Sequence, residues 1–515
     1  MAKFLVNQAL DKKRRPESKE RCSQVPKGGE LNIKTIMAFA FGPIATAGLG
    51  LLTVPAIAWI FPPADVGRLN MVQISVSFGV LLFNLGLDRA YIREYHEWND
   101  RGALLKACFV PGFALLLLVM VLTFPYDRRI SIWLFGQGHV AYYWILVACV
   151  MASFVSRFLS LILRMQDRGL AFSMSQVLPK IILLLILGVL ALPVFSKSFM
   201  ALEIAYLVSL LSVLAIYMWN TRRDWSPALT TAISQAQIRG LLSYGVPLIF
   251  AGVAYWGLDA TSSVALRSLS TLSELAVYSV SVSFAGVGVV FQTIFTVLWA
   301  PLVYKWVAHG VDMRRVDHIA QQALAVVCAI WILSGVFSWV TDFVLPARYL
   351  QVKYFMLCCI GQPLLYTLSE VTCVGIGITR KSMLSLWSTL AALIVNVSIS
   401  VWLVPSYGAA GAVVANAVAF LAFFIARTEA SAYVWRPFPR ARLYVCVVAA
   451  VALSIATLVL GPVAPVHFSF VWLAMLPIVG WHFRAEWLGM YRSLHSAVRL
   501  DDSPLLAGRG PDGRS

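Results

Sequence analysis

The sequence has few charged residues and lacks the short motifs that mark metal centres. Asp, Glu, Lys and Arg make up only 13% of its 515 residues. Its eight cysteines include no CxxC pair and its seven histidines no HExxH spacing, and the Gly-rich pieces GVGVV at 286–290 and GIG at 375–377 follow no strand and lack a GxGxxG frame. These absences argue against a zinc or redox centre and against a dinucleotide fold. We therefore expect a protein that is not an enzyme and that has no cofactor.

The sequence instead contains long hydrophobic runs. Hydrophobic residues make up 60% of the chain, and the mean hydropathy is +0.78, well above that of soluble domains. A helix needs roughly 20 apolar residues to cross a bilayer. Runs without Asp, Glu, Lys or Arg cover 35–64, 69–87, 107–126, 130–156, 181–196, 204–221, 240–258, 275–304, 319–341, 354–369, 382–426 and 443–483.

The last two runs are long enough for two crossings each. Both contain a turn sequence near the middle, PSYG at 405–408 and GPVAP at 461–465, where Pro and Gly interrupt a helix. Splitting them predicts an all-helical polytopic membrane protein with about fourteen helices.

The basic residues predict the orientation. When the crossings are counted from a cytoplasmic N-terminus, about 32 of the 41 Lys and Arg fall on the cytoplasmic side, as the positive-inside rule requires. Both termini are then cytoplasmic. The net charge of +17 follows from this topology and from contact with anionic lipid headgroups. It does not call for a nucleic-acid partner.

The two halves of the chain begin in a similar way. Residues 41–78 and 244–284 each have a Gly-Pro or Gly-x-Pro sequence, then a turn with an acidic residue two positions before a small one, then a helix rich in Val and Ser. This duplication predicts two parallel six-helix lobes. The expected parts are a basic tail (1–33), a first lobe (34–222), a linker (223–238), a second lobe (239–426), a cytoplasmic loop (427–442), two additional helices (443–483) and a cytoplasmic tail (484–515).

Six stretches carry a family resemblance. They are FPPADVGRLNMV at 61–72, NLGLDRAYIRE at 84–94, LRMQDRGLAFSMSQVLPKI at 163–181, YGVPLIF at 244–250, ELAVYSVSVSF at 274–284 and LVPSYGAAGAVVANAVAF at 403–420. Together they resemble the polysaccharide flippases of the multidrug/oligosaccharidyl-lipid/polysaccharide (MOP) exporter superfamily, and the last stretch contains that family's P-x-Y-G-x-x-G-A turn. The sequence departs from the family at Ala276, where Gly is usual, and in its long basic N-terminal tail.

The resemblance implies a function, a location and partners. Such flippases move lipid-linked O-antigen or exopolysaccharide repeat units across the bacterial inner membrane by alternating access. The implied substrate is an undecaprenyl-diphosphate-linked oligosaccharide, and the implied partners are membrane lipids and other polysaccharide-assembly proteins. Three alternatives remain open: a multidrug or cation antiporter of the same superfamily, a membrane polysaccharide polymerase or ligase, and a structural scaffold.

Basic residues near the cytoplasmic ends of the first-lobe helices are candidates for binding the diphosphate, since Arg binds phosphate oxygens in a bidentate manner. The candidates are Arg89, Arg93, Arg157 and Lys180, with Lys180 expected at the start of the helix over 181–196. The alternative is that these side chains simply reach the headgroups.

Acidic and amide residues in the second half are candidates for ion coupling and for the cavity wall. A carboxylate as deep as Glu370 must be protonated, paired or facing water. We expect Glu370 either to couple transport to protons or sodium or to pair with a nearby Arg. Asp259 is a second coupling candidate, expected near the outer end of its helix. Gln292, Gln362 and Asn416 are cavity candidates, although for Asn416 a hydrogen bond to a neighbouring helix is the favoured alternative.

Overall fold

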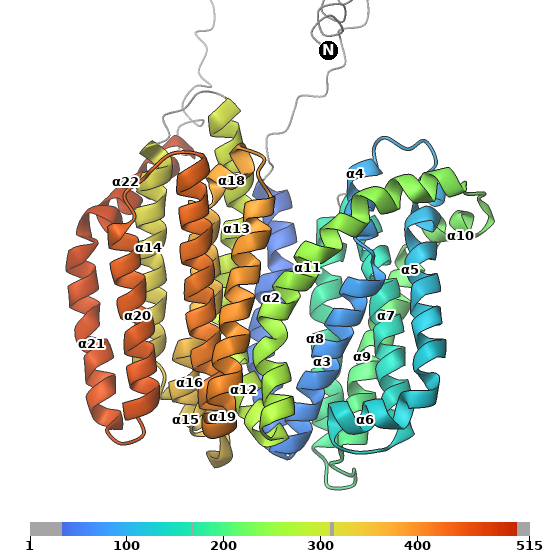
Figure 1. The fold of residues 1–515 in the computed structure, drawn as a ribbon, viewed down its shortest axis with the longest axis horizontal. Helices are drawn as coiled ribbons and strands as arrows, with labels where there is room; N and C mark the ends of the chain where they lie inside the picture. The colour runs from blue at the N-terminus through green and yellow to red at the C-terminus, as the bar shows by residue number, and fades with distance from the viewer. Residues whose placement is uncertain (1–32, 167, 309–313, 502–515) are drawn as a thin grey trace, which may run out of the picture.

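The computed structural model describes residues 33–166, 168–308 and 314–501, and all regular secondary structure in these ranges is helical (Figure 1). Most of the predicted basic tail and the last residues of the predicted C-terminal tail lie outside them. The first half contains α2 (Ile33–Ile60), α3 (Pro63–Phe83), α4 (Leu87–Glu94), α5 (Arg101–Thr123), α6 (Asp127–Phe135), α7 (Val140–Met165), α8 (Gly169–Leu190) and α9 (Phe199–Asn220).

The short helix α10 (Arg222–Thr230) leads into the second half. That half contains α11 (Gln235–Leu269), α12 (Leu272–Phe284), α13 (Gly286–Ala308), α14 (Arg314–Val336), α15 (Val340–Val344), α16 (Val352–Cys359), α17 (Gly361–Thr372), α18 (Val374–Ile378) and α19 (Met383–Val434). The chain then continues through α20 (Ala441–Leu460), α21 (Pro465–His482) and α22 (Arg484–Asp501), so the split predicted at GPVAP is confirmed.

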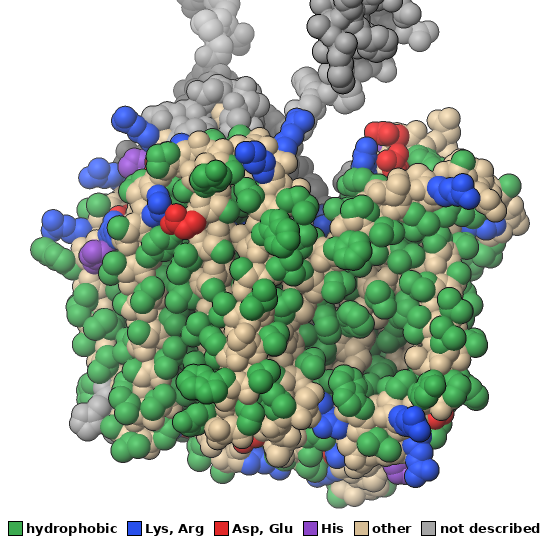
Figure 2. Space-filling model, in the orientation of Figure 1, with side chains coloured by type: hydrophobic (Ala, Val, Ile, Leu, Met, Phe, Trp, Pro, Cys, Tyr) green, Lys and Arg blue, Asp and Glu red, His purple; other side chains and the backbone are tan. Residues whose placement is uncertain are grey.

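The helices have the length and composition of membrane spans. Nine described helices are long and apolar enough to cross a membrane, or eleven if each of two bent pairs forms one span. Hydrophobic side chains cover the middle of the molecule, whereas Lys and Arg gather toward its two ends (Figure 2). The chain is therefore a multi-pass membrane protein. The total of fourteen crossings remains a prediction.

Helix α19 is a hairpin of two helices. Its 52 residues are interrupted at Gly408, whose φ of 53° and ψ of −129° are not helical. Ser385 and Arg427 line the same cavity, whereas 42 residues of straight helix would separate them by about 63 Å. The turn predicted at PSYG is confirmed. A positive φ favours glycine, which has no Cβ to clash.

The two halves join more closely at one end of the bundle than at the other. We call these the α6 end, lowest in Figure 1, and the α4 end, uppermost. At the α6 end, first-half residues such as Phe61 and Phe135 belong to the same buried hydrophobic cluster as the second half. At the α4 end, a separate cluster around Tyr91 and Phe158 has its buried members in the first half and in α10, apart from Leu241 of α11.

Several predicted boundaries are shifted because helices continue through polar residues. The predicted linker over 223–238 contains most of α10 and the start of α11, and the predicted tail after 484 begins with α22. The predicted loop over 427–442 is shorter, since α19 ends at Val434 and α20 begins at Ala441. These shifts move several charged residues from the expected ends of helices into their interiors.

Candidate functional site

Three of the predicted residues meet inside the second half. The Gln362 amide on α17 donates a hydrogen bond to Asp259 on α11. Asn416 on α19 donates to Gln362 Oε1 at 3.0 Å. The Asn416 Oδ1 atom is buried and has no hydrogen-bond partner among the described residues. Of the two alternatives for Asn416, the structure shows the hydrogen bond to another helix, and its place in a cavity wall stays a prediction.

Asp259 lies far deeper than expected. Helix α11 continues ten residues beyond it to Leu269, so it lies about 15 Å from that helix end. The side chain accepts a hydrogen bond from α17, an interior helix, and the residue is nevertheless exposed. The expectation of a position near the helix end is therefore wrong.

A buried ion pair lies closer to the α4 end. Arg427 Nη1 on α19 donates to Glu370 Oε1 on α17 at 2.8 Å and to Ser369 Oγ at 2.8 Å. The side chains of Arg427 and Glu370 are only 10% and 18% exposed. The Arg427 guanidinium also lies 5.0 Å from the centre of the Phe423 ring. Of the two roles proposed for Glu370, the structure provides the ion pair.

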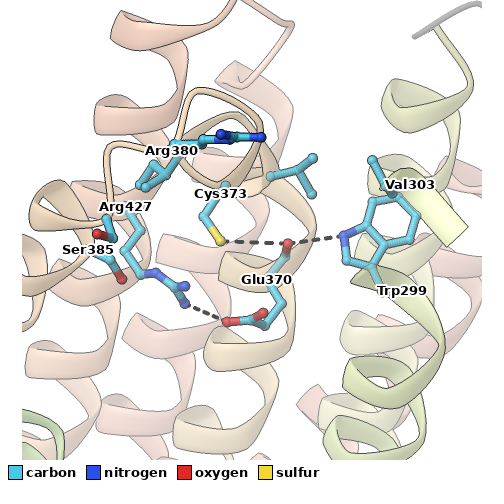
Figure 3. Close-up of a pocket in the computed structure, with 11 residues that line it drawn as sticks. Trp299, Val303, Glu370, Cys373, Arg380, Ser385 and Arg427 are labelled. Carbon is cyan, nitrogen blue, oxygen red and sulfur yellow. Dashed lines mark hydrogen bonds and ion pairs between the residues drawn. The ribbon is translucent and has the colours of Figure 1, made fainter. Parts of the chain in front are cut away.

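The pair opens onto a cavity of about 440 Å³. Figure 3 shows Glu370 and Arg427 on one side, Trp299 and Val303 of α13 on the other, and Arg380 above them. Trp299 Nε1 donates to the Glu370 carbonyl oxygen at 3.1 Å, which fixes α13 against α17. The cavity thus has two guanidinium groups and one carboxylate, and its lining is net positive.

The first half holds a second pair. Arg157 Nη2 on α7 donates to Asp88 Oδ2 on α4 at 2.7 Å, and its Nε lies 3.3 Å from the same oxygen. The Arg157 side chain remains 42% exposed, whereas that of Asp88 is 12% exposed. Arg157 therefore has a fixed partner, but part of its guanidinium still faces open space.

Lys180 occupies the middle of α8. The helix begins at Gly169, not near 181 as expected, so Lys180 lies about 17 Å from that end. The side chain is half-buried, and no carboxylate or hydrogen-bond acceptor among the described residues pairs with it. A cation without a partner at this depth is costly, and such residues typically mark substrate or ion pathways.

The remaining predicted residues do not join these clusters. Arg93 lies 3.5 Å from Glu94 and packs over the Tyr244 ring of α11 at 4.5 Å. The side chains of Arg89 and Gln292 make no hydrogen bond with any described residue. Arg93 thus acts as a contact between α4 and α11.

Contacts between the halves close the α6 end. Arg267 at the end of α11 donates to the carbonyl oxygens of Leu134 and Ile132 on α6, both at 2.9 Å. Arg348 donates to the carbonyl oxygens of Phe61, at 2.9 Å, and Ala58. Both guanidinium groups thus satisfy carbonyls at helix C-termini, where a positive charge is favourable. We call these four hydrogen bonds the arginine clasp.

Sequence reasoning missed the partners in these pairs. Arg427 was assigned to a loop, and Asp88 was not considered as a partner of Arg157. Glu203 is fully buried, and neither of its carboxylate oxygens has a hydrogen-bond partner among the described residues. The absence of Pro and Gly from residues 412–434 was the available indication that the helix continues past Arg427.

Comparison with known proteins agrees with this architecture. The family described as polysaccharide biosynthesis protein matches residues 33–305, which is more than half of the chain. No curated protein matches. Among solved structures, a lipid II flippase MurJ in an inward closed conformation aligns with a TM-score of 0.64 and 12% identity, covering 90% of this chain and 99% of that one.

A multidrug resistance MATE family transporter of the MOP superfamily, in an outward-facing conformation, aligns with a TM-score of 0.50 and 13% identity, over 78% of this chain and 95% of that one. At such identities the similarity concerns the fold. The fold and the family match agree with the resemblance in the sequence, and the chain belongs to the polysaccharide biosynthesis protein family.

Proposed function

We propose that this protein moves an undecaprenyl-diphosphate-linked oligosaccharide from the inner to the outer leaflet of the bacterial cytoplasmic membrane, with both termini in the cytoplasm. The product would serve surface polysaccharide synthesis. The family description and the flippase among the similar structures support a transport function over a catalytic one.

The proposal rests on the position and surroundings of Lys180. It is a half-buried cation at mid-depth without an anionic partner among the described residues. A diphosphate offers the negative charge that would offset its desolvation. Arg157 has exposed guanidinium surface despite its bond to Asp88. Together they would bind the head of the substrate, while the polyprenyl tail remains in the bilayer.

Alternating access is the expected mechanism. The arginine clasp and the continuous hydrophobic cluster support a state closed at the α6 end, where both halves contribute to one core. At the α4 end, Leu241 of α11 is the one second-half residue among the described buried members of the other cluster, which supports looser packing there. The substrate would enter at the α4 end, and breaking the clasp would let the α6 end open.

Asp259 is the better coupling candidate of the two predicted acids. Glu370 forms an ion pair with Arg427, whereas the partner of Asp259 is a neutral amide. The free Asn416 Oδ1 and the Asp259 carboxylate supply oxygen atoms of the kind that hard cations prefer. Sodium or a proton at this cluster would change the charge between α11, α17 and α19.

Reconstitution tests the proposal. The purified protein is placed in vesicles with a fluorescent polyprenyl-diphosphate oligosaccharide, and the fraction accessible to a membrane-impermeant quencher is followed with and without sodium or proton gradients. We expect protein-dependent crossing. Protein that leaves the lipid-linked sugar in one leaflet under every gradient contradicts the proposal.

Cation export is the second candidate. Tyr255 on α11, Tyr366 on α17 and Phe423 on α19 pack their rings together one turn from Asp259, and an acid beside aromatic rings suits an organic cation. Efflux of ethidium in the same vesicles, without movement of the lipid-linked sugar, would favour this function.

A further inference from the structure

A polar cavity lies at the α4 end of the first half, apart from the residues assigned to transport. Its volume is about 340 Å³, and its walls come from α4, the start of α5, α7 and α10. Its charged lining residues are two arginines and two aspartates: Arg101, Arg223, Asp100 and Asp224.

The opposite charges in this cavity do not neutralise each other. Neither Arg101 nor Arg223 forms an ion pair with any described residue, although both aspartates line the same space. Asp100 Oδ1 instead accepts from the backbone N–H groups of Gly102 and Ala103, at 2.8 and 3.1 Å, at the start of α5.

Asp224 is likewise occupied through one oxygen. Its Oδ1 atom accepts from Gln166 Nε2 at 2.7 Å. Each carboxylate therefore keeps one oxygen without a donor among the described residues, and each guanidinium keeps its donors. Two cations and two anions remain available to a ligand.

The floor of the cavity has a donor without an acceptor. Tyr91 is 2% exposed and lines the cavity, yet its hydroxyl makes no hydrogen bond with any described residue. The hydroxyl oxygen itself is accessible at the cavity surface, unlike the rest of the side chain. Burial raises the pKa of Tyr91, so the hydroxyl keeps its proton and can donate.

This pattern selects for a zwitterion. A simple anion would meet two carboxylates, and a simple cation would meet two guanidinium groups. A ligand with separate phosphate and ammonium groups satisfies both, with the phosphate on the arginines and the Tyr91 hydroxyl and the ammonium on the free aspartate oxygens.

An apolar cavity adjoins the polar one and points to a lipid. Its volume is about 360 Å³, it shares Leu105 with the polar cavity, and Phe109, Phe158 and Trp225 contribute to its lining. It lies between α5, α7 and α10, and exposed apolar residues of α5 such as Leu118 and Val121 continue along the membrane-facing surface. The two cavities thus offer adjacent space for a lipid headgroup and an acyl chain.

We propose that the cavity formed by Arg101, Arg223, Tyr91, Asp100 and Asp224 binds the headgroup of a phosphatidylethanolamine-type lipid, with one acyl chain in the adjoining apolar cavity. The site shares no residue with those assigned to transport and does not depend on which substrate is moved. It would hold α4 and α10 against α5 and α7 at the membrane surface.

Native mass spectrometry of the detergent-solubilised full chain tests this site. The protein is titrated with phosphatidylethanolamine, with phosphatidylglycerol of the same acyl chains, and with water-soluble glycerophosphoethanolamine. We expect one high-affinity phosphatidylethanolamine, and at least tenfold weaker binding of the other two. Equal binding of phosphatidylglycerol would overturn the zwitterion assignment, and equal binding of the soluble compound would overturn the lipid assignment.

Variants locate the bound lipid. Tyr91→Phe removes only a hydroxyl, and Arg223→Gln removes only a charge from an exposed side chain, so the fold should persist in both. Each should weaken phosphatidylethanolamine binding by about tenfold, as expected for loss of a hydrogen bond to a charged group. Arg222→Gln is the matched control, because Arg222 packs on Trp219 and does not line the cavity. Equal weakening in the control, or none in the two variants, would overturn the proposal.

Discussion

Arg427 on the second helix of the α19 hairpin donates to Glu370 on α17 at 2.8 Å, inside a helical bundle. The Arg427 guanidinium also packs over two aromatic rings. Both side chains are largely buried. In such surroundings the two charges depend on each other, because removing one leaves the other without compensation.

Arg427→Ala should therefore lower the free energy of unfolding by about 3–5 kcal/mol, as for other buried pairs that lose one partner. Thermal unfolding in detergent measures this loss. The double variant Arg427→Met with Glu370→Met should recover much of it, because no unpaired charge remains. A single variant as stable as the wild type would show that the pair is not formed in the membrane protein.

Asp259→Asn should abolish the effect of an ion gradient on transport while leaving the fold intact. The amide can still accept from Gln362, but it cannot bind a proton or neutralise sodium. The measurement is the transport rate in vesicles with and without a sodium or proton gradient. Gln292→Ala is the control, since Gln292 has no hydrogen bond with a described residue. A gradient effect that persists in Asp259→Asn would remove this acid from coupling.

Loss of the arginine clasp should open the α6 end. In Arg267→Ala with Arg348→Ala, four hydrogen bonds from charged donors to helix carbonyls disappear. Spin labels at Lys197 and Leu350, both exposed and in opposite halves, report the distance by pulsed electron resonance in a cysteine-free background. We expect a larger population of long distances.

The control for the clasp is Arg129→Ala, whose guanidinium packs near the Tyr126 ring within the same half. It should leave the distance distribution unchanged. An unchanged distribution in the clasp variant would mean that the hydrophobic cluster alone keeps this end closed.

Gly335 on α14 should be essential for the packing of α21. A Cβ atom at this position would lie 2.3 Å from the Trp472 ring, which is 2% exposed. Gly335→Ala should cost about 1–3 kcal/mol through overpacking. Gly480→Ala on α21 gains the same helix propensity but meets no atom within 4 Å. Equal melting temperatures for the two variants would contradict the close packing.

The sequence predicted features that depend on local chemistry. Continuous apolar runs predicted the helices, and the PSYG turn predicted the hairpin that Gly408 forms. The costs of burying a carboxylate led to the alternative that Glu370 pairs with an Arg, and Arg427 is that partner.

Features that depend on where helices end, or on which helices meet, could not be predicted from the sequence. Lys180 and Asp259 were placed at helix ends because their runs stop at a charge, yet both helices continue past them. Hydrogen bonding between Asp259, Gln362 and Asn416 joins residues 103 and 54 positions apart. Sequence spacing carries no information about such contacts.

The most direct test of the account is the rate at which Lys180→Gln moves a polyprenyl-diphosphate oligosaccharide across reconstituted vesicles. The matched control is Lys197→Gln, which removes the same charge from an exposed position between α8 and α9. We predict that the wild type and the control move the lipid at similar rates and that Lys180→Gln is at least about tenfold slower, as for loss of one charge-assisted contact. A Lys180→Gln rate equal to that of the wild type would contradict the role of this lysine in binding the diphosphate.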